Sequence, residues 1–147
     1  MVKRLRKASF VPAAVAGMLA AVAACAPIAE DGDAAAERLY GRDWIAEVIA
    51  GRPAAPAVES TLSVAAGGKV SGNAGCNGYF GSVIIDGQAM SFGNLGATKI
   101  ACPEPAMGQE DRLLAALDST RGYRLENGTL LLLDGAGAVL VRFRENL

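Results

Sequence analysis

The residues of this chain that could do chemistry are three cysteines, Cys25, Cys76 and Cys102, and carboxylate pairs such as the adjacent Glu110 and Asp111. The 147 residues include no histidine. Without an imidazole, neither a Ser-His-Asp nor a Cys-His arrangement can be assembled. No C-x-x-C spacing is present, which weakens the case for a redox pair or a metal site. We therefore expect no catalytic residues, no metal and no cofactor.

The first cysteine ends a segment that is typical of export signals. Residues 1–7 carry four basic side chains and no acid, and an uncharged apolar run covers residues 10–24. This run is short for a transmembrane helix, which needs about 20 apolar residues. It ends in Val22-Ala23-Ala24-Cys25, which resembles the lipobox of bacterial lipoproteins. We interpret residues 1–24 as a lipoprotein signal peptide and Cys25 as the lipidation site; the alternatives are cleavage that leaves a free thiol, and a permanent signal anchor.

This interpretation places the protein in the cell envelope, attached to the membrane through a lipid anchor. Position 26 is alanine instead of aspartate, which by similarity to Gram-negative sorting favours the outer membrane, facing the periplasm. Without the four basic residues of the signal, ten basic side chains stand against 15 acidic ones. Because nucleic acids need a basic surface, we expect none as a partner. The expected partners are the membrane and an unknown envelope protein or apolar ligand.

The other two cysteines form an even pair in an exported chain, which favours a disulfide between Cys76 and Cys102. In the chain-entropy picture, closing this loop stabilises the fold by roughly 3–4 kcal/mol. That is a large share of the stability of a small domain. Separate thiols and a chemically active pair are the alternatives.

The exported part divides into a tether over residues 25–40 and one domain over residues 41–147. Short runs of alternating polar and apolar residues predict strands in the domain. These runs are residues 44–49, 60–64, 82–85, 88–92, 123–126, 129–133 and 139–144. Asp86-Gly87 and Asn127-Gly128 predict type I′ hairpin turns. In the last strand, Val139, Val141 and Phe143 are expected to share one face.

One segment, residues 105–117, has a helical pattern instead. Proline stands at its entrance, where a missing N–H costs little. Its apolar stripe consists of Met107, Leu113, Leu114 and Leu117. We expect this stripe to pack on the sheet and the carboxylates of Glu110 and Asp111 to face solvent. Many strands with one helix indicate an α+β fold.

The most informative segment is the glycine-rich stretch 72–81, GNAGCNGYFG. Glycine at this density indicates tight bends or close approach of backbone segments. We expect Asn73 and Asn77 to hydrogen-bond main-chain groups around the bend. Asn73, Asn77 and Tyr79 are also the candidates for a binding loop, so a binding role and a structural role are both open.

Several blocks of sequence, in the same order, resemble the META domain, or HslJ-like family. The blocks are Val70-Ser71-Gly72, Gly75-Cys76-Asn77, Tyr79-Phe80-Gly81, Ser91-Phe92, Thr98–Pro103, and Met107 with Glu110. The resemblance extends from about residue 44 to residue 143. It implies a small α+β domain, with a strongly bent antiparallel sheet or open β-barrel and one packed helix. It also implies an envelope lipoprotein linked to stress or antibiotic tolerance, with no known catalytic residues.

These observations together predict a non-enzymatic envelope lipoprotein whose domain binds or scaffolds another envelope component. One alternative is a carrier of a lipid or hydrophobic peptide, since an open barrel can hold an apolar ligand. Another is an inhibitor or chaperone-like partner of a secreted protein, which would use exposed strand edges.

Overall fold

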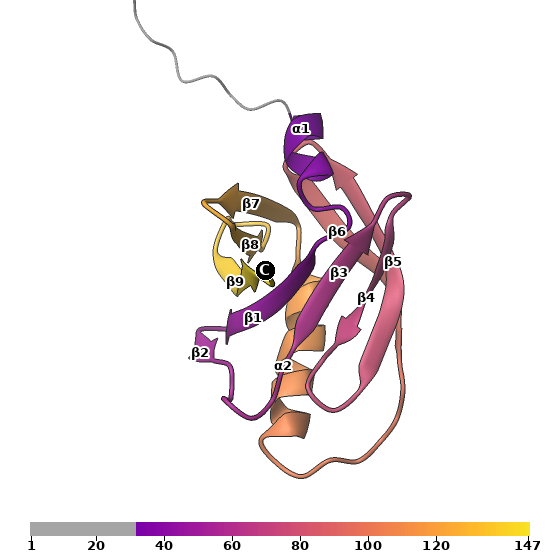
Figure 1. Ribbon diagram of the computed structural model, residues 1–147, viewed down its shortest axis with the longest axis vertical. Helices are drawn as coiled ribbons and strands as arrows, with labels where there is room; N and C mark the ends of the chain where they lie inside the picture. The colour runs from indigo at the N-terminus through magenta and orange to yellow at the C-terminus, as the bar shows by residue number, and fades with distance from the viewer. Residues whose placement is uncertain (1–31) are drawn as a thin grey trace, which may run out of the picture.

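The structure of the protein is a computed structural model that describes residues 32–147 (Figure 1). The predicted signal peptide, Cys25 and the first part of the predicted tether lie outside these residues. The described part has two helices, α1 (Gly32–Glu37) and α2 (Ala106–Ser119). Its strands are β1 (Asp43–Ile49), β2 (Arg52–Pro53), β3 (Thr61–Ala65), β4 (Lys69–Asn73), β5 (Gly78–Asp86), β6 (Ala89–Ala97), β7 (Gly122–Glu126), β8 (Thr129–Leu133) and β9 (Val139–Glu145).

The strands form one antiparallel sheet that curves strongly into a ring (Figure 1). Their order is β2-β1-β3-β4-β5-β6-β7-β8-β9, and a further pairing of β1 with β9 joins the two sides of the ring. Helix α2 packs against β6, β1 and β9. The predicted α+β class, with a strongly bent antiparallel sheet and one packed helix, is confirmed.

Glycine positions set the geometry of two hairpins. The β7–β8 loop, Asn127-Gly128, has φ angles of 48° and 77°, as a type I′ turn requires. In the β5–β6 loop, Asp86 pairs with Ala89, so the two central residues are Gly87 and Gln88. Among these, only Gly87 has a positive φ, of 59°. The predicted hairpin is present, but its turn fits type II′ instead of type I′.

The predicted inner face of β9 is wrong at its first residue. Val141 and Phe143 are fully buried, whereas Val139 is 46% exposed. The register between β8 and β9 shifts between Leu132, which pairs with Val141, and Leu133, which pairs with Val139. Alternation along a strand predicts which side chains share a face only where the pairing register is regular. The shift therefore turns Val139 to the exposed face, away from Val141 and Phe143.

Large side chains fill the inside of the ring. The bulkiest are Trp44, Tyr79, Tyr123 and Phe143, each at most 2% exposed. Helix α2 adds Leu113 and Leu117, which are both fully buried. Burial of this apolar surface is the main source of stability for a domain of this size.

The packed domain begins earlier than the predicted end of the tether at residue 40. Ala36 and Leu39 are buried, and Leu39 belongs to the hydrophobic core. Tyr40 makes an isolated bridge to Val64 of β3. The segment that follows α1 is therefore part of the fold. Neither helix of residues 32–147 is long and apolar enough to cross a membrane.

Candidate functional site

The glycine-rich segment 72–81 joins β4 to β5 and passes very close to other backbone. A Cβ atom on Gly72 would lie 2.1 Å from the carbonyl oxygen of Thr61. At Gly75, where φ is 137°, a Cβ atom would lie 2.9 Å from the carbonyl oxygen of Ala106 in α2. Both positions need glycine because a side chain would displace backbone atoms.

The side chain of Asn77 fastens this loop to the segment that precedes α2. Its Oδ1 accepts hydrogen bonds from the backbone N–H of Ile100, at 2.7 Å, and from the Thr98 hydroxyl, at 2.8 Å. Its Nδ2 donates to the carbonyl oxygen of Ile100 and to Oε1 of Glu110, both at 3.0 Å. The expected bonding of Asn77 to main-chain groups is therefore present, and this buried amide is fully satisfied.

The predicted position of Glu110 on a solvated helix face is wrong. Glu110 is only 6% exposed, whereas its neighbour Asp111 is exposed, as predicted. Its Oε2 accepts hydrogen bonds from the backbone N–H of Asn77, at 2.7 Å, and of Cys76, at 3.3 Å. A carboxylate can be buried at moderate cost when several N–H donors surround it. Glu110 thus joins α2 directly to the glycine-rich loop.

A disulfide joins Cys76 of the glycine-rich loop to Cys102 in the segment before α2, as predicted. The two Cα atoms are 5.9 Å apart, and 26 positions separate the cysteines in the sequence. The bond ties the glycine-rich loop to the segment leading into α2, next to the contact between Asn77 and Glu110. Such a bond stabilises the fold mainly by restricting the unfolded chain.

Gln109, which the sequence did not single out, connects α2 to the segment between β2 and β3. It is fully buried. Its Oε1 accepts a hydrogen bond from the backbone N–H of Ala55 at 2.7 Å, and its Nε2 donates to Val58 O and Ser60 Oγ, both at 2.8 Å. Its burial could have been predicted from the sequence, because Gln109 lies four residues before Leu113 and so shares the buried face of the helix.

The other two candidate residues of the loop also have internal partners. Oδ1 of Asn73 accepts a hydrogen bond from the backbone N–H of Gly75 at 2.7 Å. The hydroxyl of Tyr79 donates to the carbonyl oxygen of Thr61 at 2.8 Å. Burial raises the pKa of Tyr79 well above its ordinary value of 10.0. These contacts favour the structural role over the binding role for Asn73, Asn77 and Tyr79.

The candidate cysteines of the described part and the carboxylate of Glu110 are all held by partners within the fold. Cys76 and Cys102 are joined to each other, and Glu110 is occupied by donors of the loop. No group of three or more His, Cys, Asp or Glu side chains in residues 32–147 could hold a metal ion. Cys25, the predicted lipidation site, lies outside the described residues.

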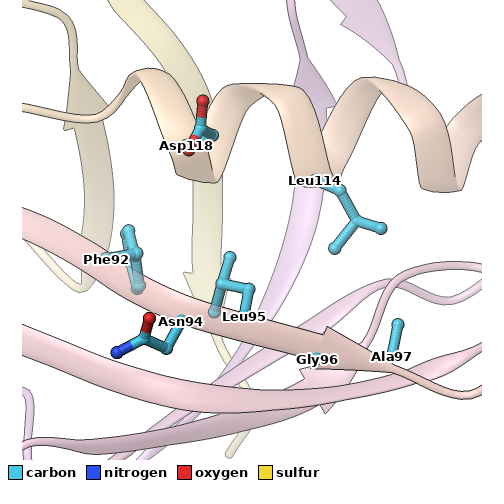
Figure 2. A pocket seen from close by; sticks show the side chains of 7 residues that line it. All are labelled: Phe92, Asn94, Leu95, Gly96, Ala97, Leu114 and Asp118. Carbon is cyan, nitrogen blue, oxygen red and sulfur yellow. The ribbon is translucent and has the colours of Figure 1, made fainter.

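The ring is weakly closed between β6 and β7. Their ladder contains one residue pair, Ala89 with Gly122, whereas β5 and β6 pair at seven positions. The backbone N–H of Met90 still donates to Arg121 O. Beyond that point, within the part of the chain that the structure describes, β6 has a strand neighbour only on its β5 side. Helix α2 lies along the other side (Figure 2).

A pocket of about 200 Å³ lies between β6 and α2. Figure 2 shows Phe92, Leu95 and Ala97 on the side of β6 that faces the helix, with Leu114 extending from α2 towards the strand. Asn94 and Asp118 add polar atoms to the lining. The pocket therefore combines apolar side chains with the weakly paired edge of a strand.

An irregularity in β6 places these side chains. The β5–β6 register shifts between Ser82, which pairs with Gly93, and Phe80, which pairs with Gly96. Asn94 lies at the shift with a φ of 50°, a conformation that asparagine tolerates better than most residues. The extra residue brings Leu95 to the side of the strand that Phe92 occupies, where alternation alone would not place it.

These features define a class of small α+β domain, in which a ring-shaped antiparallel sheet is covered by one helix that a glycine-rich loop fastens in place. The model of the META domain matches residues 37–147. The chain therefore belongs to the META-domain family, as the resemblance predicted. A search of curated proteins found no significant match.

Three solved structures are similar to this chain. An NMR structure of a protein from Burkholderia xenovorans is 30% identical, with a TM-score of 0.60, and the match covers 77% of this chain and 87% of that one. A second NMR structure is 18% identical, with a TM-score of 0.60 and coverage of 74% and 92%. A crystal structure of a DUF4847-family protein from Bacteroides vulgatus is 16% identical, with a TM-score of 0.59 and coverage of 76% and 97%. The last two similarities concern the fold alone.

Proposed function

We propose that the protein is a non-enzymatic binding domain of the cell envelope that holds an extended, apolar segment of another envelope protein between β6 and α2. The observation that carries this proposal is the single-pair ladder between β6 and β7. Because this ladder ends at Ala89, residues 91–97 of β6 have helix α2, and no strand of the described chain, on the side away from β5. A free strand edge binds an extended peptide through main-chain hydrogen bonds, and an adjacent pocket selects its side chains.

The lining of the pocket supports an apolar peptide as the ligand. Phe92, Leu95 and Leu114 provide apolar contacts, while Asn94 and Asp118 can bond the peptide backbone. A volume of about 200 Å³ suits one or two side chains better than a long acyl chain. A lipid carrier has less support, because the core side chains fill the inside of the ring.

The proposed location is the periplasmic face of the outer membrane, with the domain held by lipid at Cys25. The support is the basic start of the chain, the apolar run after it and the lipobox at residues 22–25. A link to stress or antibiotic tolerance has the family resemblance as its support.

Photocrosslinking in living cells tests the peptide site. A photoreactive residue would replace Asn94 at the pocket or, as a matched control, the exposed Ala136 in the β8–β9 loop. We expect a discrete crosslinked envelope protein from position 94 and none from position 136. Adding Leu114→Glu, which places a charge on a partly exposed wall of the pocket, should abolish the crosslink without unfolding the domain.

Two results would count against the peptide site. One is the same crosslinked species from both positions, which would indicate random collision. The other is a crosslink from position 94 that Leu114→Glu does not weaken, while circular dichroism shows that the variant is folded.

A further inference from the structure

Strand β5 carries two large apolar side chains on the outer face of the sheet. Phe80 and Ile84 are 62% and 71% exposed, whereas Tyr79 and Val83, which precede them, are buried inside the ring. Because side chains alternate along a strand, Phe80 and Ile84 share one face and lie about 13 Å apart along it. Neighbouring exposed apolar side chains indicate a contact surface, whereas a single one needs no explanation.

The neighbouring strands leave these two side chains uncovered. On β6, Phe80 lies opposite Gly96, and Ile84 lies opposite Ser91. A Cβ atom on Gly96 would lie 3.1 Å from the ring of Phe80, so this ring lies across the glycine. On β4, Ser71 lies opposite Phe80. Because these partners are small, the two apolar side chains project beyond the surface of the sheet.

The charges of this region differ from those of the rest of the domain. Residues 61–103, which include β3 to β6, contain one acid, Asp86, and two lysines, Lys69 and Lys99. Lys69 pairs with Ser82, the residue of β5 midway between the two exposed apolar side chains. The region is therefore slightly positive, although acids outnumber basic residues in the domain as a whole.

The outer face is also hollowed beside the ring of Phe80. A pocket of about 470 Å³ lies there, and Ala65 and Lys69 belong to its lining. It shares no lining residue with the pocket between β6 and α2, so the two sites are separate. Exposed apolar side chains beside a lysine are typical of surfaces that lie on membranes, where the apolar groups enter the headgroup region and the cation meets anionic lipid.

The start of the described chain lies next to this strand. Helix α1, which begins at Gly32, contacts β5 (Figure 1). The chain from Cys25 to Gly32 extends over at most about 25 Å. A lipid at Cys25 would therefore hold the part of β5 that contacts α1 close to the membrane surface.

We propose that the outer face of β4 and β5 rests on the phospholipid surface of the membrane that holds the anchor. Phe80 and Ile84 enter the headgroup region, and Lys69 contacts anionic headgroups. A surface contact of this kind adds a second attachment to the lipid and fixes the orientation of the domain. The inference rests on the proposed anchor at Cys25 and does not depend on the peptide site.

Photocrosslinking to lipid in living cells tests the contact. A photoreactive residue would replace Ile84 or, as a matched control, Val139. Val139 is also apolar and exposed, and its strand β9 is four strands from β5 in either direction around the ring. The intact mass of the purified protein is measured after illumination. We expect the added mass of one phospholipid, besides the anchor, from position 84 and none from position 139.

Charge variants test the contribution of the lysine. Lys69→Gln should lower the yield of the adduct at position 84 by up to about fivefold, because it removes a cation from a surface that faces anionic lipid. Arg144→Gln, which removes an exposed cation from β9, should leave the yield unchanged.

The same mass spectrum distinguishes the contact from the anchor. A lipidated protein without a phospholipid adduct at position 84 overturns the contact and leaves the anchor standing. An unlipidated protein that still forms the adduct overturns the anchor alone, and loss of both overturns both. Equal yields from positions 84 and 139, equal effects of Lys69→Gln and Arg144→Gln, or a crosslinked protein in place of a phospholipid would also overturn the contact.

Discussion

At the scale of single residues, the buried carboxylate of Glu110 joins a helix to a loop that lies 33 and 34 positions earlier in the sequence. Glu110→Ala leaves the backbone N–H groups of Cys76 and Asn77 without this acceptor. We predict that it lowers the free energy of unfolding by about 3 kcal/mol. Urea denaturation of the variant and of the unchanged protein measures this difference.

The adjacent residue provides the control for Glu110. Asp111→Ala removes an exposed carboxylate from the same turn of α2 and should change the free energy of unfolding by less than about 0.5 kcal/mol. Equal effects of the two substitutions would mean that the hydrogen bonds of Glu110 add nothing to the free energy of unfolding beyond the effect of its charge.

Two buried tyrosines offer a second matched comparison. Tyr79 donates a hydrogen bond to Thr61 O, whereas the hydroxyl of Tyr123 has no partner in the described residues. Tyr79→Phe should destabilise the domain by about 1–2 kcal/mol, because it removes this hydrogen bond. Tyr123→Phe should leave stability unchanged or raise it. Thermal unfolding followed by circular dichroism distinguishes the two, and an equal loss for both would contradict the assigned hydrogen bonding.

At the scale of elements, the glycines of β4 and β5 differ in how much space surrounds them. Gly72 lies against Thr61 O of β3, whereas the nearest atom to a Cβ on Gly78 would be 3.8 Å away. We predict that Gly72→Ala destabilises the domain by more than about 3 kcal/mol and that Gly78→Ala changes stability by less than about 1 kcal/mol. Urea denaturation tests both, and a tolerated Gly72→Ala would show that β3 and β4 can separate at little cost.

The sequence predicted the elements better than the contacts between them. Alternation and the Asn127-Gly128 turn located β7, β8 and most of β9, and apolar spacing located α2, because these signals are local. The burial of Glu110 was missed because it depends on donors in a distant loop. Val139 was misplaced because a register shift between neighbouring strands leaves no mark on either strand's own pattern.

The candidate sites show the same limit. The cysteine pair could be predicted because an even number of cysteines in an exported chain favours a bond. The pocket beside β6 could not, since it depends on the weak β6–β7 ladder and on the shift at Asn94.

At the scale of the whole molecule, the proposed anchor limits where the domain can lie. The chain from Cys25 to Gly32 extends over at most about 25 Å. A lipid at Cys25 would therefore keep α1, and the end of the ring that follows it, close to the membrane surface. The proposed function depends first on this attachment, because an unanchored domain would meet a different set of partners.

The most direct test is the intact mass of the protein isolated from its native membrane, before and after reduction and thiol labelling. We predict a chain that begins at Cys25, is heavier by the mass of a lipid, and shows two thiols only after reduction. A chain without lipid, with Cys76 and Cys102 labelled before reduction, would contradict both the anchored location and the disulfide that fastens the loop to the helix.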